Sequence, residues 1–267
     1  MTGIDVKLDT RAFRRALISV LPHVSAEKDD FFLGRVRAYA TGGNLVLCAT
    51  DRFTAAMAWV ELDEADGEVG CLDLMLADAQ QLLAVHRVPK EGTYTLQLRT
   101  DGQYTWATDV SGLGFGGREL RMESPTVDKT YPDVAHMLGL VAQSAGWQDS
   151  WAEVPAPLLN LVHGQYLSRF AVAGKVFDEY IAVESVVKPM SLLVTVGDRF
   201  IGALMPRRDS HDAAQEKWLK QFRLDAQVIA EDVATAHPAP PRREQASDVV
   251  NLDDLIPTQD DEDGSDG

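Results

Sequence analysis

The chain has 267 residues, of which 45% are apolar and 25% charged, and its net charge is −16. This composition is that of a soluble globular protein, and no apolar run is long enough to cross a bilayer. The first ten residues lack a basic segment followed by an apolar one, so we expect no signal peptide. Such an acidic chain excludes a protein that grips nucleic acid over its whole surface, although a local basic face is compatible with it.

The acidic charge is concentrated at the C-terminal end. Residues 237–267 hold two arginines against nine acids, a net charge of −7, which leaves −9 for residues 1–236. Because this segment is Pro-rich and then acidic, we predict that it is disordered. Apolar residues between 249 and 256 leave two interpretations open, a linear motif that docks on a partner and a solubilising tail.

The N-terminal residues predict a strand over 5–9 followed by a helix over 11–21. Asp9 and Thr10 are both candidates for the N-cap of this helix. Its apolar residues recur at spacings of three and four, which gives it a core face. The other side of the helix carries three arginines, which are surface neighbours: Arg11, Arg14 and Arg15.

Strands and a second helix follow. The Gly42-Gly43-Asn44 break predicts a hairpin turn, and a further strand runs through Met57 and Trp59. A helix is predicted over 76–88, then a hairpin with its turn at Asp101-Gly102, then one more strand. Residues 1–122 thus contain one unit of helix and strands twice. This pattern predicts an α+β fold in which a helix pair lies on curved antiparallel sheets.

The pattern breaks at 130–138 (TYPDVAHML), which we interpret as a linker into a second domain. A third helix is predicted over 157–174, then two strands, and Ser210 can cap a last helix over 211–235. The core candidates of the third helix are Leu158, Leu161, Val162, Leu167 and Phe170. We expect a first domain over 1–125, a shortened second domain over 126–208, an additional helix over 209–236 and the tail over 237–267.

The tripeptide Asp-Arg-Phe occurs twice, at 51–53 and at 198–200, each time after an apolar strand-like run. Repetition of one structural unit explains such a pair. In both copies small and apolar residues follow the tripeptide and end near a methionine.

Patterns of catalytic and metal sites are absent from the sequence. The six histidines are scattered, and Cys48 and Cys71 lie among apolar residues, as expected for small buried side chains in a reducing cytoplasm. The run GLGFGG (112–117) resembles a phosphate-binding loop, but no helix follows it, which favours a flexible loop between strands. We therefore expect no enzyme, no metal and no cofactor.

Four short segments resemble, in order and spacing, segments of bacterial DNA polymerase III beta subunits, the DNA sliding clamps. Residues 45–58 (LVLCATDRFTAAMA) are similar to the Ala-Thr-Asp-Gly strand motif of that family, and 131–138 to the segment that opens a clamp domain. Residues 163–174 (HGQYLSRFAVAG) are similar to the helix of the last clamp domain, and 192–208 to the Met-Pro-x-Arg end of the clamp. The resemblance implies the DNA-clamp fold, with repeated half-domain units, helices lining a hole and sheets outside.

The resemblance also implies a processivity factor that encircles duplex DNA without reading its sequence and tethers a replicative polymerase. Cationic residues on the three helices are then the candidates for DNA binding, although a basic helix face is often simply a solvated one. The candidates are Arg11, Arg14, Arg15, Arg87, Lys90, Arg169 and Lys175.

A second implied site is a groove that binds linear peptide motifs of the polymerase and the clamp loader. One wall is implied at Thr50, Arg52, Phe53, Thr54 and Ala55, and the other at Met205, Pro206 and Arg207. For Phe53 and Met205, plain core packing is the open alternative. The Arg52-Phe53 pair stands where the family commonly has Gly and a polar or basic residue.

Bacterial clamps have three domains per chain, whereas this chain has at most two. Two-domain chains close as trimers in phage and eukaryotic clamps, so we expect a homo-trimer in the cytoplasm of a bacterial cell, with no membrane partner, encoded by the bacterium or a phage. The alternative hypothesis is a clamp-fold adaptor or decoy that binds replication peptides without closing a ring on DNA.

Overall fold

The computed structural model describes residues 4–27, 32–41, 43–63, 70–89, 91–112, 117–125, 131–145, 162–186 and 191–205, together with Val228. Its contacts divide the chain into two compact units, Met1–Arg208 and Asp209–Gly267. Apart from Val228, the helix predicted over 211–235 and the tail lie outside the described residues, and all elements below belong to the first unit.

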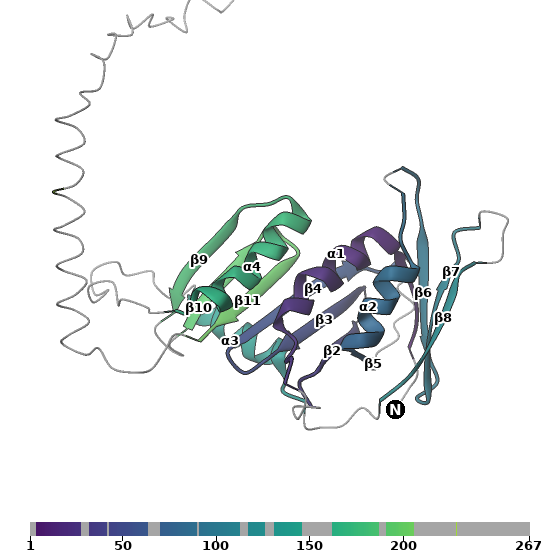
Figure 1. Ribbon diagram of the computed structural model, residues 1–267, viewed down its shortest axis with the longest axis horizontal. Helices are drawn as coiled ribbons and strands as arrows, with labels where there is room; N and C mark the ends of the chain where they lie inside the picture. Colours follow the sequence, from purple (N-terminus) through teal and green to yellow (C-terminus); the bar gives the residue numbers. More distant parts are fainter. Residues whose placement is uncertain are drawn as a thin grey trace, which may run out of the picture. The chain divides into compact units, whose positions relative to one another are not determined.

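The described residues of Met1–Arg208 form two antiparallel sheets (Figure 1). The four-stranded sheet has, in spatial order, β1 (Asp5–Asp9), β6 (Thr95–Thr100), β7 (Tyr104–Asp109) and β8 (Glu119–Glu123). The seven-stranded sheet has, in spatial order, β5 (Gly70–Met75), β2 (Arg35–Thr41), β3 (Asn44–Thr50), β4 (Thr54–Glu61), β11 (Phe200–Leu204), β10 (Ser191–Val196) and β9 (Ile181–Val186).

The strand order confirms a repeated half-domain unit. The first half-domain unit is β1, α1 (Thr10–Val20) and β2 to β4, and the second half-domain unit is β5, α2 (Leu76–Val85) and β6 to β8. The leading strand of each unit pairs with the sheet of the other, β1 with β6 and β5 with β2. A third unit follows, with α4 (Gly164–Phe177) and β9 to β11. The predicted α+β fold of helices on antiparallel sheets is confirmed.

The third half-domain unit joins the first half-domain unit through the pairing of β4 with β11. Ala55 lies opposite Ala203 and Met57 opposite Ile201, so the two stretches that follow Asp-Arg-Phe are neighbouring antiparallel strands. A Cβ atom at Gly202 would lie 2.8 Å from the carbonyl oxygen of Ala55, so this close approach requires a glycine. The sheet pairs strands that lie before and after residue 125 in the sequence, so strand pairing does not mark the domain boundary expected there. That boundary stays a prediction.

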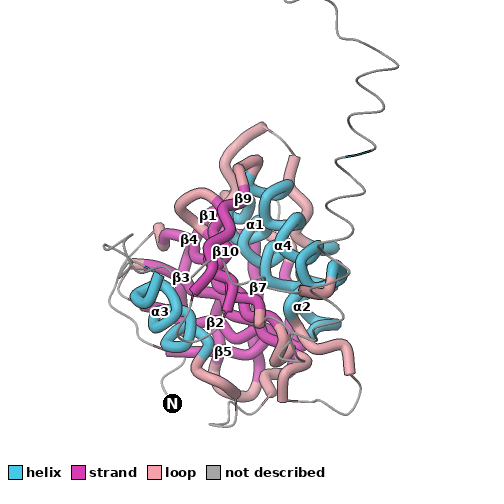
Figure 2. The backbone as a smooth tube through the Cα atoms, turned by 90° about the vertical axis from the view of Figure 1, so that its left-hand side faces the viewer, coloured by secondary structure: helices cyan, strands magenta, loops and turns pink. Residues whose placement is uncertain are grey.

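Helix α1 forms where the sequence predicts it, and Asp9 is its N-cap. The Asp9 carboxylate accepts the backbone N–H of Ala12 at 2.7 Å. Phe13, Leu17 and Val20 are fully buried and pack in the main core. Figure 2 shows α1, α2 and α4 together on one side of the strands. The sheet therefore has one face covered by three helices.

Helix α3 (Val134–Ala145) lies on the opposite side of the strands (Figure 2). The linker predicted over 130–138 is therefore wrong for its helical part. The Asp133 carboxylate accepts the backbone N–H of His136 at 3.0 Å and begins the helix. Val134, Leu138 and Val141 pack in a second core against the sheet. The sequence did not predict this helix, because a single stripe of three apolar residues is too short a pattern to distinguish a helix from an irregular segment.

Two smaller predictions also differ from the structure. Leu167, a predicted core residue of α4, is 41% exposed, while Leu158 and Leu161 lie outside the described residues. Cys48 is buried as expected, but Cys71 is only half-buried, and both are free thiols.

Among the described residues, no helix has the length and apolar character needed to cross a membrane. The described part of the chain also holds no group of three His, Cys, Asp or Glu side chains placed to bind a metal ion.

Candidate functional site

The loop between β3 and β4 is built around the carboxylate of Asp51. One carboxylate oxygen accepts the backbone N–H of Phe53 at 3.1 Å, and the N–H and hydroxyl of Thr54 at 2.7 and 2.9 Å. Between them, Arg52 has φ 76°, a left-handed conformation that is uncommon for a residue with a side chain. The three hydrogen bonds hold the loop in this strained shape and direct Arg52 and Phe53 outward.

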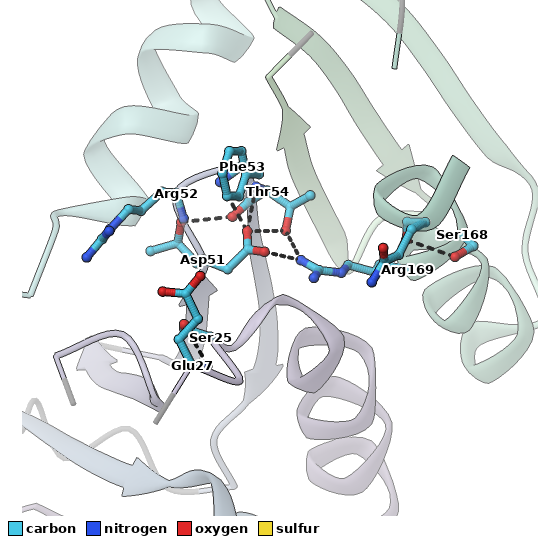
Figure 3. Close-up of polar contacts among 10 residues, drawn as sticks. Ser25, Glu27, Asp51, Arg52, Phe53, Thr54, Ser168 and Arg169 are labelled. Carbon is cyan, nitrogen blue, oxygen red and sulfur yellow. Dashed lines mark hydrogen bonds and ion pairs between the residues drawn. The ribbon is translucent and has the colours of Figure 1, made fainter. Parts of the chain in front are cut away.

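Arg169 of α4 reaches this loop from the third half-domain unit (Figure 3). Its guanidinium pairs with the other oxygen of Asp51 and donates to the hydroxyl of Thr54 at 3.0 Å. Burial alone would raise the pKa of Asp51, but the hydrogen bonds from Arg169 and Thr54 outweigh it and hold that pKa below its usual value. A charge-assisted contact therefore joins α4 to the first half-domain unit, beside the pairing of β4 with β11.

An exposed apolar corner lies at the same end of the two strands; we call Phe53, Tyr166 and Met205 the Phe53 corner. Phe53 is 48% exposed and Met205 43% exposed. The Met205 backbone N–H donates to the carbonyl oxygen of Phe53 at 2.9 Å. The Phe53 ring stacks on Tyr166 with 5.1 Å between ring centroids, and His163 approaches Tyr166 edge-on. Core packing is thus excluded as the role of Phe53 and Met205.

The other predicted groove residues have different environments. Thr50, Thr54 and Ala55 are buried, and Ala55 belongs to the core beneath α3. These three residues support the corner from below, whereas Arg52 is exposed beside it. Pro206 and Arg207 lie outside the described residues. Tyr166 was missed, because the only sequence signal for it is an aromatic residue in the first turn of a predicted helix.

Of the three helices on the shared face, α1 and α4 are basic. Helices α1, α2 and α4 contain five cationic side chains and a single acidic one, Asp78, in a chain with a net charge of −16. The cationic ones are Arg11, Arg14, Arg15, Arg169 and Lys175. A positive face on an acidic protein focuses an anionic partner onto that face.

The structure separates the predicted DNA-binding residues by what they contact. Arg11 donates to the carbonyl of Pro89 at 2.9 Å, and Arg14 to that of His86 at 3.1 Å, so both tie α1 to the end of α2. Arg169 is engaged with Asp51, as described above. Among the described candidates, three are exposed: Arg15 of α1, Lys175 of α4 and Arg87, which follows α2. Lys90 lies outside the described residues.

Comparison with solved structures identifies the class: the described chain has the DNA sliding clamp fold. It is similar to the DNA polymerase III beta subunit of Thermotoga maritima, with 17% sequence identity, a TM-score of 0.55 and coverage of 79% of this chain and 67% of that chain. The beta subunit of Streptococcus pyogenes has 12% identity and a TM-score of 0.55, with 79% and 67% of the two chains covered.

A third similar structure is the sliding clamp of Pseudomonas aeruginosa, solved bound to griselimycin. It has 14% identity and a TM-score of 0.51, with 80% of this chain and 68% of that chain covered. At these identities the likeness establishes the fold. No family model and no curated protein matches the sequence.

Proposed function

We propose that this protein is a DNA sliding clamp, a ring of several copies that surrounds duplex DNA and tethers a replicative DNA polymerase in a bacterial cell. The observation that carries the proposal is the charge segregation of the fold. The helices on one face hold five cations against Asp78, although the chain as a whole is strongly acidic.

Such a face suits a partner that is bound without recognition of its base sequence. Phosphate contacts from Lys and Arg carry no sequence information, and their strength depends on salt. Exposed cations such as Arg15 and Lys175 supply these contacts, while the acidic remainder repels DNA from other surfaces. A ring needs only weak contacts, because its closure keeps it on the duplex.

The joint between half-domain units supports the same proposal. Pairing of β4 with β11 makes one continuous sheet, with α1 and α4 packed together on one side. If two copies of the chain joined through the same kind of strand pairing, both the helical face and the sheet would continue from one copy to the next. We assign this protein no catalytic step.

The Phe53 corner is the proposed site for linear peptide motifs of the polymerase and the clamp loader. Exposed aromatic and methionine side chains bind apolar anchors of peptides, and methionine adapts to anchors of different shape. The loop that presents Phe53 is fixed by Asp51, so little ordering is needed when a peptide binds.

Charge reversal tests the DNA-binding face. We expect the double variant Arg15→Glu and Lys175→Glu to lower the affinity for a short fluorescent duplex at low salt. Loss of two phosphate contacts would reduce the slope of log affinity against log salt by about 2. The measurement is fluorescence anisotropy over a salt series.

The matched control is Arg99→Glu with Arg121→Glu, which changes the charge equally on the other side of the four-stranded sheet, over Trp106. We expect the control to alter binding far less. Equal losses for both pairs would contradict a DNA-binding helix face. Peptide binding without any affinity for DNA would instead favour the clamp-fold adaptor.

A further inference from the structure

The four-stranded sheet has a face that points away from the helices. Side chains alternate along its strands, so Leu98 of β6 and Ala107 of β7 enter the main core while their neighbours lie on the opposite face. On that opposite face Arg99 of β6 lies directly across from Trp106 of β7, and Trp106 lies directly across from Arg121 of β8. The middle of the sheet therefore carries a tryptophan between two arginines.

Both arginines lie over aromatic rings. The guanidinium carbon of Arg99 is 4.9 Å from the centroid of the Trp106 ring, and that of Arg121 is 3.6 Å from the centroid of the Tyr104 ring. The rings of Tyr104 and Trp106 are themselves neighbours, with 5.9 Å between centroids. Within the described part of the chain, neither guanidinium has a salt bridge to a carboxylate. We call Arg99, Tyr104, Trp106 and Arg121 the Trp106 face.

The Trp106 face combines planar surfaces with hydrogen-bond donors. Arg99 and Arg121 are exposed, whereas Tyr104 and Trp106 are half-buried beneath them. A cation–π contact holds a guanidinium in place and leaves the N–H groups at its edge for an oxyanion. Nucleic-acid bases stack on aromatic rings and on arginine guanidinium planes alike, and a phosphate accompanies each base. The chemistry of this face therefore suits a ligand that has both open bases and phosphates.

The charge around the Trp106 face favours a single strand over a duplex. A nearly neutral surface gains little from a ligand that offers phosphates alone, as a duplex does to a flat sheet because its bases are paired and stacked. A single strand adds base stacking, which an acidic peptide lacks. Among the described residues, the surroundings of this face hold one more cation and four acids: Lys7, Asp5, Asp101, Glu119 and Glu123.

We propose that the Trp106 face binds single-stranded DNA, with bases stacked against the two rings and the two guanidiniums and with phosphates at the guanidinium edges. The site lies on the side of the four-stranded sheet away from α1 and α2, so it is separate from the basic helix face. It is also separate from the Phe53 corner, which belongs to the seven-stranded sheet. Contacts of this kind do not read the base sequence, and binding here does not require a closed ring.

Loss of the tryptophan ring tests the stacking. Fluorescence anisotropy measures the affinity for a short labelled oligothymidylate, with excess unlabelled duplex present to occupy the helix face. We expect Trp106→Thr to weaken binding about tenfold or more, since the stacking of a base contributes that much. The matched control is Trp59→Thr, which removes a half-buried tryptophan from β4 of the other sheet and should keep the affinity of the parent. Absence of binding by the parent, or equal affinities of the parent and Trp106→Thr, would overturn the proposal.

A second variant keeps both rings and tests the guanidiniums. We expect Arg99→Gln with Arg121→Gln to weaken binding of the oligothymidylate. Loss of two phosphate contacts to a single strand should also reduce the slope of log affinity against log salt by about 1.4. An unchanged affinity and slope would contradict the role of the arginines.

A second ligand separates stacking from charge. An oligomer of abasic sites has the phosphates of the oligothymidylate without its bases, and we expect the parent to bind it about tenfold more weakly or worse. Equal affinity for the two oligomers would overturn the proposal. So would displacement of the labelled strand by polyglutamate as effectively as by unlabelled oligothymidylate, because it would assign the face to acidic peptides.

Failure of this proposal is distinguishable from failure of the clamp function. Binding of a single strand that depends on Trp106, in a protein without affinity for duplex DNA, would refute the clamp and leave the Trp106 face. Duplex affinity that falls on reversal of Arg15 and Lys175, without binding of a single strand that depends on Trp106, would refute the Trp106 face and leave the basic helix face.

Discussion

The backbone N–H of Met205 donates to the carbonyl oxygen of Phe53 at 2.9 Å and so joins the end of β11 to the loop before β4. The contact uses only main-chain atoms, so both side chains stay exposed. Two residues from distant parts of the chain thereby present one apolar corner. Its stability depends on the β4–β11 pairing and on the Asp51 loop, and both can be tested separately.

Removal of the Phe53 ring should weaken ligand binding at this corner. A synthetic peptide with the linear motif of a replicative polymerase, the class of ligand proposed for this corner, serves as the probe. We expect Phe53→Ala to lower its affinity by about tenfold or more, as truncation of an aromatic anchor does. The measurement is isothermal titration calorimetry. Tyr180→Ala, which removes an exposed aromatic ring elsewhere, is the control, and equal affinities of the parent and Phe53→Ala would place binding outside the corner.

Loss of Arg169 should destabilise the joint between units. Arg169→Met leaves the half-buried Asp51 carboxylate without its ionic partner, and we expect a cost of about 2 kcal/mol in the free energy of unfolding. Arg199→Met is the matched control, because Arg199 pairs with the exposed Glu61 and such surface pairs contribute at most about 1 kcal/mol. Urea denaturation measures both, and similar losses would show that the Asp51 contact has no special role.

His23 should make stability depend on pH. It is buried against Phe170 at 4.6 Å between ring centroids, and within the described chain neither ring nitrogen has a hydrogen-bond partner. Burial, and then the nearby Arg169, lower the pKa of His23 to about 3, although Asp51 opposes the shift. In the unfolded chain the pKa of histidine is about 6.5.

The sign of the effect follows from these two pKa values. The stability from a neutral buried His23 is complete above pH ~6.5, because neither state then binds the proton. As pH falls toward 3 only the unfolded chain takes it up, so stability falls by up to about 1.4 kcal/mol per pH unit. His23→Leu should flatten the curve of unfolding free energy against pH in this window. Parallel curves for parent and variant would show that His23 does not cause this pH dependence.

Two glycines should respond in opposite directions to alanine. At Gly202 a Cβ atom would meet the carbonyl oxygen of Ala55 and the ring of Phe170, so Gly202→Ala should cost about 1–3 kcal/mol. At Gly139, inside α3, nothing lies within 4 Å, so Gly139→Ala should stabilise by up to about 1 kcal/mol. Thermal unfolding compares them, and a stable Gly202→Ala would argue against the close β4–β11 approach.

Elements with local signals were predictable from the sequence. The Asp9 cap and the apolar spacing after it mark α1, and Asp101 accepts the backbone N–H groups of Gln103 and Tyr104 at 2.8 Å, as a turn signal predicts. Helix α3 was not predicted, because Pro132 and a short apolar stripe look like a connection between domains. Its Asp133 cap was the one local signal available.

Strand pairing and exposure were harder to predict, because both depend on distant parts of the chain. The exchange of β1 and β5 between units has no local signature. The resemblance to clamps brought Phe53 and Met205 into one proposed groove, but Ala55 lies under α3, a helix that the sequence did not predict. The exposed and buried members of the groove therefore could not be separated in advance.

The most direct test of the clamp proposal is retention on DNA through topology. The protein is mixed with duplex DNA anchored to a bead at one end, the free end is then capped with a bulky protein, and the beads are washed in high salt. We expect the protein to stay on capped DNA, to be lost from uncapped DNA and to be released when a nuclease cuts the duplex. Loss from capped and uncapped DNA alike would contradict a ring around DNA.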